Sequence, residues 1–332
     1  MKKNKIKDTG LEVTELSFGT SSLGSMPDTY GYEVPEQRAQ ETLKRFFQGP
    51  VNMLDTSRNY AMGESEKRIG TAIKENGGWP EKFVLSTKID RNMDTLVLDK
   101  KRTRESVEES LKTLNVDSVD VLFLHDPEYV KDINDVTKKD GALDELFKIK
   151  DEGLAKAVGL AMGRIDIMFP ILRKWDFDVI INHNRYTLLN READEMYNYA
   201  HSKNISIFNA APYAGGVLAK GPNNFKKITY QDATEEKLAP VREIEKICKK
   251  YNVEMGAAAL QFSMKDKRIT STICGVTSVQ SIEKNISWAE TDIPQEFWNE
   301  VLKLPYSSKD PESERVYTCL LYTSDAADEE AS

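Results

Sequence analysis

Cysteine and histidine are scarce in this 332-residue chain, and this limits the metal chemistry that it can perform. The three cysteines, Cys248, Cys274 and Cys319, lie far apart and show no metal-ligand spacing. Only three histidines accompany them, so few nitrogen and sulfur ligands are available for a structural zinc site. We therefore expect no bound metal.

Long apolar runs are missing as well, since no stretch approaches the roughly 20 residues that a membrane-spanning helix needs. The basic start, MKKNKIK, is not followed by the apolar segment of a signal peptide, so we expect a cytoplasmic protein with no membrane partner. The net charge of −8 at pH 7 argues against a nucleic-acid partner and favours a small polar or neutral substrate. The oligomeric state stays open.

Short apolar runs alternate with longer amphipathic stretches along most of the chain, which predicts an α/β fold. A G-x-G-x-x-G turn is absent after the first strand, and this argues against a doubly wound dinucleotide fold. About eight strand–helix units favour a (β/α)8 TIM barrel that forms a single domain over residues 1–317. The predicted strands are residues 13–20, 51–55, 83–88, 119–125, 154–161, 178–182, 205–211 and 269–275.

Helices are predicted between these strands from apolar residues at helical spacing. A loop over residues 212–237 precedes a helix that Pro240 opens, with Val241, Ile244 and Cys248 on its inner face. One further helix, residues 294–305, lies beyond the barrel. The other predicted helices are residues 35–47, 63–78, 103–115, 141–153, 164–175, 191–203 and 278–287.

The last residues, 318–332, match no element of this pattern. Residues 319–329, CLLYTSDAADE, resemble the in-frame translation of a sequencing adaptor. We interpret the segment as a non-native tail, and a genuine disordered tail is the alternative. Cys319 is therefore not used to infer chemistry.

Ionisable residues stand at the ends of three consecutive predicted strands. Asp55, Lys88 and His125 end these strands, and Tyr60 lies five residues beyond Asp55. Functional side chains of a barrel lie at this end of its strands, so the four side chains are predicted to meet. Each has an ordinary explanation, such as capping, a snorkelling lysine or packing. Desolvating all four together without a purpose would be costly.

This group suits hydride transfer, in which a proton leaves or joins the oxygen as hydride moves at carbon. Tyr60 is the candidate general acid/base, but a free tyrosine has a pKa of about 10. We expect the Lys88 ammonium to lower that pKa; three units would need about 4 kcal/mol. Asp55 would hold Lys88, and His125 would orient the reacting oxygen.

At this point the chain resembles the aldo-keto reductases, through LSFGTSSLG, LDTSRNYAMGESEKRIGTAI, LSTK and VDVLFLHDPE. The resemblance implies that Asp55, Tyr60, Lys88 and His125 are the catalytic tetrad. Later segments, VGLAMGRIDIM, INHNRYTLLNREA and FNAAPYAGGVLAKGP, are similar to the aldose 1-dehydrogenase branch, which includes L-fucose and D-galactose dehydrogenases. That likeness implies NAD(P)-dependent oxidation of the C1 hemiacetal of an aldose to its lactone.

The chain departs from the family pattern where the nicotinamide is held. Ala161 and Met162 replace a serine–asparagine pair, His183 replaces a glutamine, and Ala210 replaces an aromatic residue. His183 becomes a candidate nicotinamide contact, with packing as the alternative. The residues that we expect to contact the cofactor are Gly19, Thr20, Asp55, His183, Gly275, Thr277, Ser278 and Asn285.

The turn from Gly275 into the last barrel helix offers backbone donors for the cofactor phosphates. An ordinary helix cap by Thr277 or Ser278 is the alternative. Relatives that prefer NADP carry lysine and arginine here, whereas this chain has Gly275 and Ser281 with Glu283 nearby. NAD or NADP is thus the expected cofactor, with NAD weakly favoured.

Three other functions stay open. A general aldehyde, ketone or pyridoxal reductase would run the same tetrad in the opposite direction. A nicotinamide-nucleotide-binding regulatory protein would bind without turnover, but it has no need of Tyr60 and Lys88 together. A barrel with lyase or isomerase chemistry is not excluded by fold alone. The substrate loops are expected at residues 26–34 and 212–237.

Overall fold

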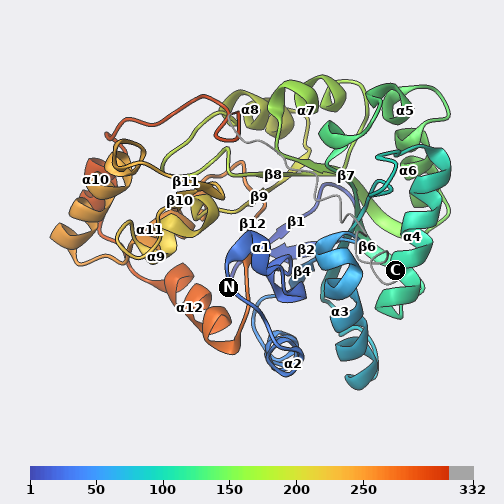
Figure 1. Cartoon of the computed structure of the whole chain (residues 1–332), viewed down its shortest axis with the longest axis horizontal. Coiled ribbons are helices and arrows are strands. Elements are labelled where there is room, and N and C mark those ends of the chain that lie inside the picture. The colour runs from blue at the N-terminus through green and yellow to red at the C-terminus, as the bar shows by residue number, and fades with distance from the viewer. Residues whose placement is uncertain (314–332) are drawn as a thin grey trace, which may run out of the picture.

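A closed barrel of eight parallel strands lies at the centre of the computed structural model, which describes residues 1–313 (Figure 1). The strands follow one another around the barrel in chain order, and the last pairs with the first. This confirms the predicted (β/α)8 TIM barrel. The barrel strands are β3 (Leu16–Gly19), β4 (Met53–Asp55), β5 (Val84–Ile89), β6 (Val119–His125), β7 (Ala155–Met162), β8 (Val179–His183), β9 (Ser206–Ala210) and β12 (Ser271–Gly275).

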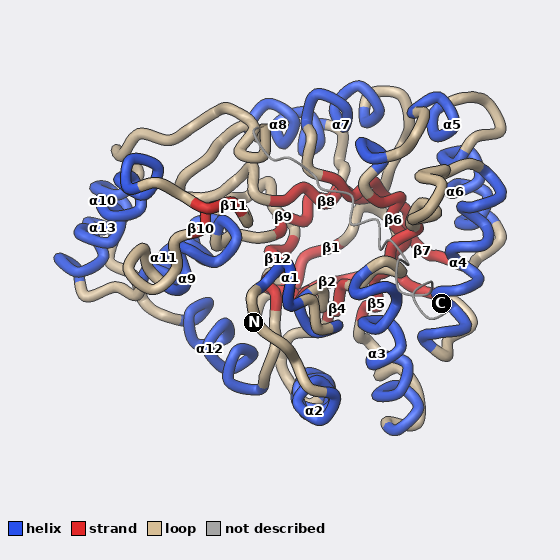
Figure 2. The backbone as a smooth tube through the Cα atoms, in the orientation of Figure 1, coloured by secondary structure: helices blue, strands red, loops and turns tan. Residues whose placement is uncertain are grey.

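Helices surround the strands on the outside, as Figure 2 shows. Their apolar faces cover the barrel, so the strands are buried on both sides and read as nearly continuous apolar runs. Eight helices follow the strands in turn: α2 (Glu36–Phe47), α3 (Glu64–Glu75), α4 (Lys100–Leu114), α6 (Ala142–Asp151), α7 (Ile165–Leu172), α8 (Asp194–Ser202), α11 (Met255–Met264) and α12 (Val279–Glu290).

The remaining helices lie in the connections or beyond the last strand. They are α1 (Pro27–Tyr30), α5 (Ile133–Thr137), α9 (Val217–Lys220), α10 (Glu235–Tyr251) and α13 (Gln295–Val301), together with the 3₁₀ turns at residues 22–24, 60–63, 127–129 and 214–216. None of the helices within residues 1–313 is long and apolar enough to cross a membrane.

An N-terminal hairpin contributes to the barrel interior, which the polar start of the chain did not predict. It pairs β1 (Lys3–Lys5) with β2 (Glu12–Thr14) in antiparallel fashion. Its side chains Ile6 and Val13 are fully buried in the same apolar cluster as Phe123 and Phe208 from the barrel strands. Apolar side chains therefore fill the barrel. The polar residues of the candidate site lie at the C-terminal ends of the strands.

The helix before the last strand differs from the prediction. Pro240 lies inside α10 rather than at its start, because the helix begins at Glu235 and the Thr234 side chain accepts a hydrogen bond from the Lys237 N–H. The unpredicted helix α11 packs against β12 and α12, whereas α10 packs against α11 and α13. Residues 256–263 of α11 are all buried, so the sequence shows no amphipathic pattern there.

The expected loop over residues 212–237 holds local structure of its own, including α9 and a small hairpin of β10 (Lys227–Ile228) and β11 (Gln231–Asp232). The end of the predicted domain at residue 317, the predicted tail 318–332 and Cys319 lie outside the described residues. In the part that the structure describes, no group of three or more histidine, cysteine, aspartate or glutamate residues is placed to hold a metal ion.

Candidate active site

The ends of β4, β5 and β6 bring the four predicted catalytic residues together. Asp55 and His125 are the last residues of their strands, Lys88 lies one residue before the end of β5, and Tyr60 begins the turn after β4. These strands are neighbours in the barrel, so their side chains converge at one end of it. The predicted grouping is therefore present in the structure.

The Lys88 ammonium is the centre of this group. It donates hydrogen bonds to Asp55 Oδ2 at 2.7 Å, to the Thr56 carbonyl at 2.6 Å and to the Tyr60 hydroxyl oxygen at 3.0 Å. Ser86 donates to the other oxygen of Asp55 at 2.9 Å. Because the three ammonium protons are all taken up by these acceptors, the proton of the Tyr60 hydroxyl is left for another partner.

The pKa of Tyr60 moves in the direction opposite to the one expected from Lys88. Burial raises the pKa of the Tyr60 phenol well above 10, and the nearby Asp55 carboxylate acts in the same direction. The expectation of a lowered pKa for Tyr60 is therefore wrong. The resting state of Tyr60 is a neutral phenol, so the phenol has to lose its proton before it can accept one in an oxidation.

The turn that carries Tyr60 has an unusual backbone. Ala61, Met62 and Gly63 all have positive φ angles, of 51°, 54° and 93°. Such angles are unfavourable for alanine and methionine, and strained residues of this kind concentrate at functional sites. At Gly63 a Cβ would overlap the guanidinium of Arg58, so only glycine fits there. The turn therefore fixes where the Tyr60 side chain points.

Asp90, which the sequence analysis missed, completes the site from the end of β5. Its buried carboxylate accepts a hydrogen bond from His125 Nδ1 at 2.7 Å, from the Asn59 N–H at 2.9 Å and from the Ser57 hydroxyl. The Asn59 N–H lies next to Tyr60 in the chain. The sequence could have pointed to Asp90. Every second residue of a strand lies on the same face, and Asp90 stands two residues after Lys88.

The contact with Asp90 sets the state of His125. Nδ1 donates to the carboxylate, so Nε2 is left for the reacting oxygen, and the His125 ring meets the Tyr60 ring edge to face at 5.8 Å between centroids. Burial alone would lower the pKa of His125, but the Asp126 and Asp90 carboxylates outweigh it and the net pKa is raised. For Asp90 itself burial would raise the pKa, and His125 outweighs that effect and lowers it.

The predicted cofactor residues on β3 lie beside the tetrad. Gly19 pairs with Asp55 across the two strands. Thr20 donates to the Asp55 carbonyl from both its N–H, at 3.0 Å, and its hydroxyl, at 2.9 Å. The Thr20 side chain is fully buried, so its hydroxyl supports the end of β4.

The predicted phosphate turn at the start of α12 is occupied by its own helix cap. Ser278 is the N-cap residue, and the Ser281 hydroxyl accepts from the N–H groups of Thr277 at 2.9 Å and Ser278 at 3.0 Å. The buried Asn285 side chain accepts from the Tyr213 hydroxyl and donates to the Ser281 carbonyl at 2.7 Å. Gly275 and these residues lie together, and the N–H groups of Thr277 and Ser278 are paired inside the protein.

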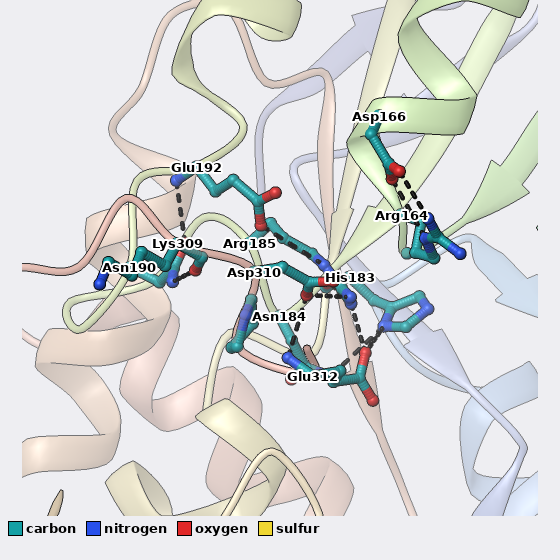
Figure 3. A network of polar contacts seen from close by, with 12 residues as sticks. Arg164, Asp166, His183, Asn184, Arg185, Asn190, Glu192, Lys309, Asp310 and Glu312 are labelled. Carbon is teal, nitrogen blue, oxygen red and sulfur yellow. Dashed lines mark hydrogen bonds and ion pairs between the residues drawn. The ribbon is translucent and has the colours of Figure 1, made fainter. Parts of the chain in front are cut away.

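At the end of β8, His183 belongs to a network around the buried Arg185 (Figure 3). The Arg185 guanidinium pairs with Asp310 at 2.5 Å and with Glu312, and Glu192 lies 3.8 Å away. Glu312 also lies 3.8 Å from His183 Nδ1. Burial lowers the pKa of His183, so its ring is neutral near pH 7. Arg185 thus fastens the segment after α13 to the end of β8.

The residue after His183 offers a free acceptor that the sequence analysis did not identify. Asn184 is buried, and its Oδ1 accepts no hydrogen bond within residues 1–313. Its amide nitrogen lies 3.3 Å from His183 Nδ1. An unsatisfied buried acceptor is costly, and the amide NH₂ of a nicotinamide would satisfy it. His183 and Asn184 therefore fit a carboxamide, although Ala161 and Met162 of β7 provide no polar side chains.

The chain matches a known protein family over most of its length. A model described as the aldo/keto reductase family matches residues 15–304. The L-galactose dehydrogenase of Arabidopsis thaliana is 30% identical over 84% of this chain and 85% of its own length. The D-threo-aldose 1-dehydrogenase of a Pseudomonas species is 27% identical over 88% of this chain and 94% of its own.

Two further relatives extend the comparison. The pyridoxal 4-dehydrogenase of Microbacterium luteolum is 26% identical over 89% of this chain and 95% of its own length. Among solved structures, the holo form of an aldo-keto reductase from Bacillus halodurans superimposes with a TM-score of 0.76, covering 95% of this chain and 100% of that one at 22% identity. This last likeness supports the fold.

Proposed function

Because this chain belongs to the aldo/keto reductase family and is an oxidoreductase, we propose that it oxidises the C1 hemiacetal of an aldose of the L-galactose, L-fucose or D-galactose type to the lactone. The observation that carries the chemistry is the Asp55–Lys88–Tyr60 chain of hydrogen bonds, which leaves the Tyr60 proton position open to a reacting oxygen. The choice of substrate rests on the aldose dehydrogenases among the relatives.

The reaction removes a hydride from C1 and a proton from O1, and a C1=O double bond forms. An oxidised nicotinamide ring supplies the hydride acceptor when it is bound. Tyr60, as phenolate, takes the O1 proton, and Lys88 stabilises the charge before transfer. His125, with Nδ1 held by Asp90, presents Nε2 to O1 and so orients it, while the single O1 proton passes to Tyr60.

The residues that would hold the nucleotide come from three places at the barrel end: the end of β3, the end of β8 and the start of α12. His183 and Asn184 would contact the carboxamide, and Gly19 and Thr20 would lie beside the ring. The first turn of α12, with Gly275, Thr277 and Ser278, would receive the phosphates, and Asn285 would lie one turn further along. Phosphate binding there requires the Ser281 hydroxyl to release or share the N–H groups that it now accepts from.

We propose NAD as the preferred cofactor. Gly275 and Ser281 provide no cation for the 2′-phosphate of NADP, and Glu283 adds a negative charge. The nearby Arg45 is already paired with Glu283, with Nε 2.5 Å from Oε1. The positive charge of Arg45 is therefore already paired.

A panel of substrates tests the proposed function. The purified protein is incubated with NAD and, separately, with L-galactose, L-fucose, D-galactose and pyridoxal, and NADH formation is followed by absorbance while the lactone is identified by mass spectrometry. In the reverse direction, NADH consumption is followed with aromatic aldehydes. We expect the highest kcat/KM with one of the aldoses. Efficient aldehyde reduction without aldose oxidation would contradict the proposal, and tight nucleotide binding without any turnover would favour a regulatory role.

Pyridoxal is the second candidate substrate, because the pyridoxal 4-dehydrogenase matches over 89% of this chain. Pyridoxal also forms an internal hemiacetal, so the same hydride and proton transfers apply to it. It differs from an aldose in having an aromatic ring in place of hydroxyl groups. The same panel separates the two substrates.

A further inference from the structure

Asp126, the residue after His125, has a conformation and an environment that the tetrad chemistry does not explain. Its backbone is left-handed, with φ 45° and ψ 50°, directly at the end of β6. Its N–H donates to the Ala161 carbonyl at 2.9 Å, which extends the pairing of β6 with β7 by one residue. Left-handed residues other than glycine cost stability and concentrate at functional sites.

An ordinary structural role for the Asp126 side chain is not seen. The residue occupies the N-cap position of the 3₁₀ turn Pro127–Tyr129, but its side chain makes no cap hydrogen bond. Its Oδ1 atom is shielded from solvent and accepts no hydrogen bond from any residue in the range 1–313. The Asp126 side chain is 23% exposed, so it borders the open end of the barrel.

The Asp126 carboxylate lies close to the place that the reacting oxygen would occupy. Asp126 Oδ1 lies 3.6 Å from His125 Nε2, the nitrogen that faces the substrate oxygen. A carboxylate at this place repels the negative charge that develops on oxygen when a simple aldehyde is reduced. The same carboxylate is a strong acceptor for a hydroxyl group close to that oxygen.

We infer that Asp126 accepts a hydrogen bond from the C2 hydroxyl of the aldose. The inference rests on the proposed function, since it requires a sugar hemiacetal at the tetrad. C1 of such a sugar is bonded to O1, to the ring oxygen and to C2. The ring oxygen has no proton to donate, so the C2 hydroxyl is the donor next to the reacting group. Asp126 thus selects substrates that carry a hydroxyl beside the oxidised carbon.

The test compares an aldose with its 2-deoxy counterpart, using D-galactose and 2-deoxy-D-galactose or the matching pair for the aldose that the wild-type protein oxidises best. Asp126→Gly removes the carboxylate and suits the left-handed backbone, and Asp126→Asn removes only the charge. Asp166→Asn is the matched control, because Asp166 lies in the first turn of α7, after β7, with its carboxylate 2.5 Å from Arg164.

In Asp126→Gly we expect kcat/KM for the aldose to fall by about 10- to 100-fold, as for loss of a hydrogen bond to a charged group. For the 2-deoxy sugar we expect a loss at least about threefold smaller, since it lacks the hydroxyl and shares only the effect of the lost charge on His125. Asp126→Asn should lie between wild type and Asp126→Gly, and Asp166→Asn should match wild type on both sugars.

Equal losses on both sugars would overturn the inference, because Asp126 would then act through His125 rather than on the substrate. No loss on either sugar would overturn it too. Both results leave the proposed function standing, since the wild-type protein would still oxidise the aldose. If the wild-type protein oxidises no aldose, the proposed function fails, and the role of Asp126 fails with it.

Discussion

The two sides of the barrel end are built differently. On the catalytic side, from β4 to β6, the polar side chains bond to one another: Asp55 to Lys88, Lys88 to Tyr60, and His125 to Asp90. On the side proposed for the nucleotide, from β8 to α12, polar groups such as the Ser281 hydroxyl bond to their own helix turn, and Asn184 Oδ1 is left without a hydrogen bond within residues 1–313. The catalytic side is therefore preorganised, whereas the nucleotide side has to exchange internal hydrogen bonds for ligand contacts.

The largest effect is expected from Tyr60→Phe, which separates catalysis from nucleotide binding. This variant removes only the hydroxyl that exchanges the O1 proton, so kcat should fall by about 10³-fold or more. The Kd for NAD, measured by fluorescence titration, should stay within about threefold of wild type, because no proposed nucleotide contact changes. Full activity in Tyr60→Phe would refute the role of Tyr60, and lost NAD binding would show that the two sides are not separable.

A large effect on stability is expected from the nucleotide side, at Arg185. Arg185→Met leaves the buried Glu312 carboxylate without its cation, which should lower the free energy of unfolding by about 3 kcal/mol. The measurement is urea denaturation followed by circular dichroism. Arg164→Met is the control, because the Arg164–Asp166 pair is exposed and should contribute less than about 1 kcal/mol. Equal losses in the two variants would mean that Arg185 does not fasten the segment after α13.

On the catalytic side, Asp90→Asn should shift the pH profile of oxidation. Oxidation needs His125 neutral and Tyr60 ionised, and both pKa values are raised, so kcat/KM for the wild-type protein should rise from pH 6 towards pH 10. In Asp90→Asn the pKa of His125 falls, because one of the carboxylates that raise it is gone, and the acidic limb moves to lower pH. We expect about a tenfold lower kcat/KM than wild type when both are compared at the same pH above the limb. An unchanged limb would show that Asp90 does not control His125.

The smallest effect is expected for the choice of nucleotide. With Gly275, Ser281 and Glu283 in the phosphate turn, NAD should give at least the same kcat/KM as NADP. Initial rates with each nucleotide at a fixed concentration of the best aldose provide the measurement. A tenfold or greater advantage for NADP would contradict this expectation and would place a cation near the 2′-phosphate that the contacts of Arg45 do not suggest.

Much of the fold follows from local patterns in the sequence. The barrel strands are short apolar runs, and Asp55, Lys88 and His125 could be placed at one site because they end neighbouring strands. The helix α11 escaped prediction since it is buried on all sides and shows no polar face. The N-terminal hairpin escaped because its polar residues conceal the buried Ile6, and because Val13 was assigned to a first barrel strand over residues 13–20, which the structure divides into β2 and β3.

The electrostatics of the site could not be predicted in the same way. The direction of the Tyr60 pKa depends on how deeply the phenol is buried, and this is a property of the folded chain rather than of the motif. The nucleotide side was equally hard to predict, because the use of the Ser278 and Thr277 N–H groups by Ser281 depends on cap geometry. Family resemblance singled out the four candidate catalytic residues, but not the hydrogen bonds made by Ser281 at the start of α12.

The ion pairs of Arg185 with Asp310 and Glu312 also have a consequence for biosynthesis. Arg185 is separated from these partners by 125 and 127 residues, so the ribosome produces the guanidinium long before its carboxylates. Until those residues emerge, the Arg185 guanidinium at the end of β8 lacks its counter-ions. The ion pairs around Arg185 therefore stay incomplete during that time. The contacts around Arg185 can therefore form only after every barrel strand has been synthesised.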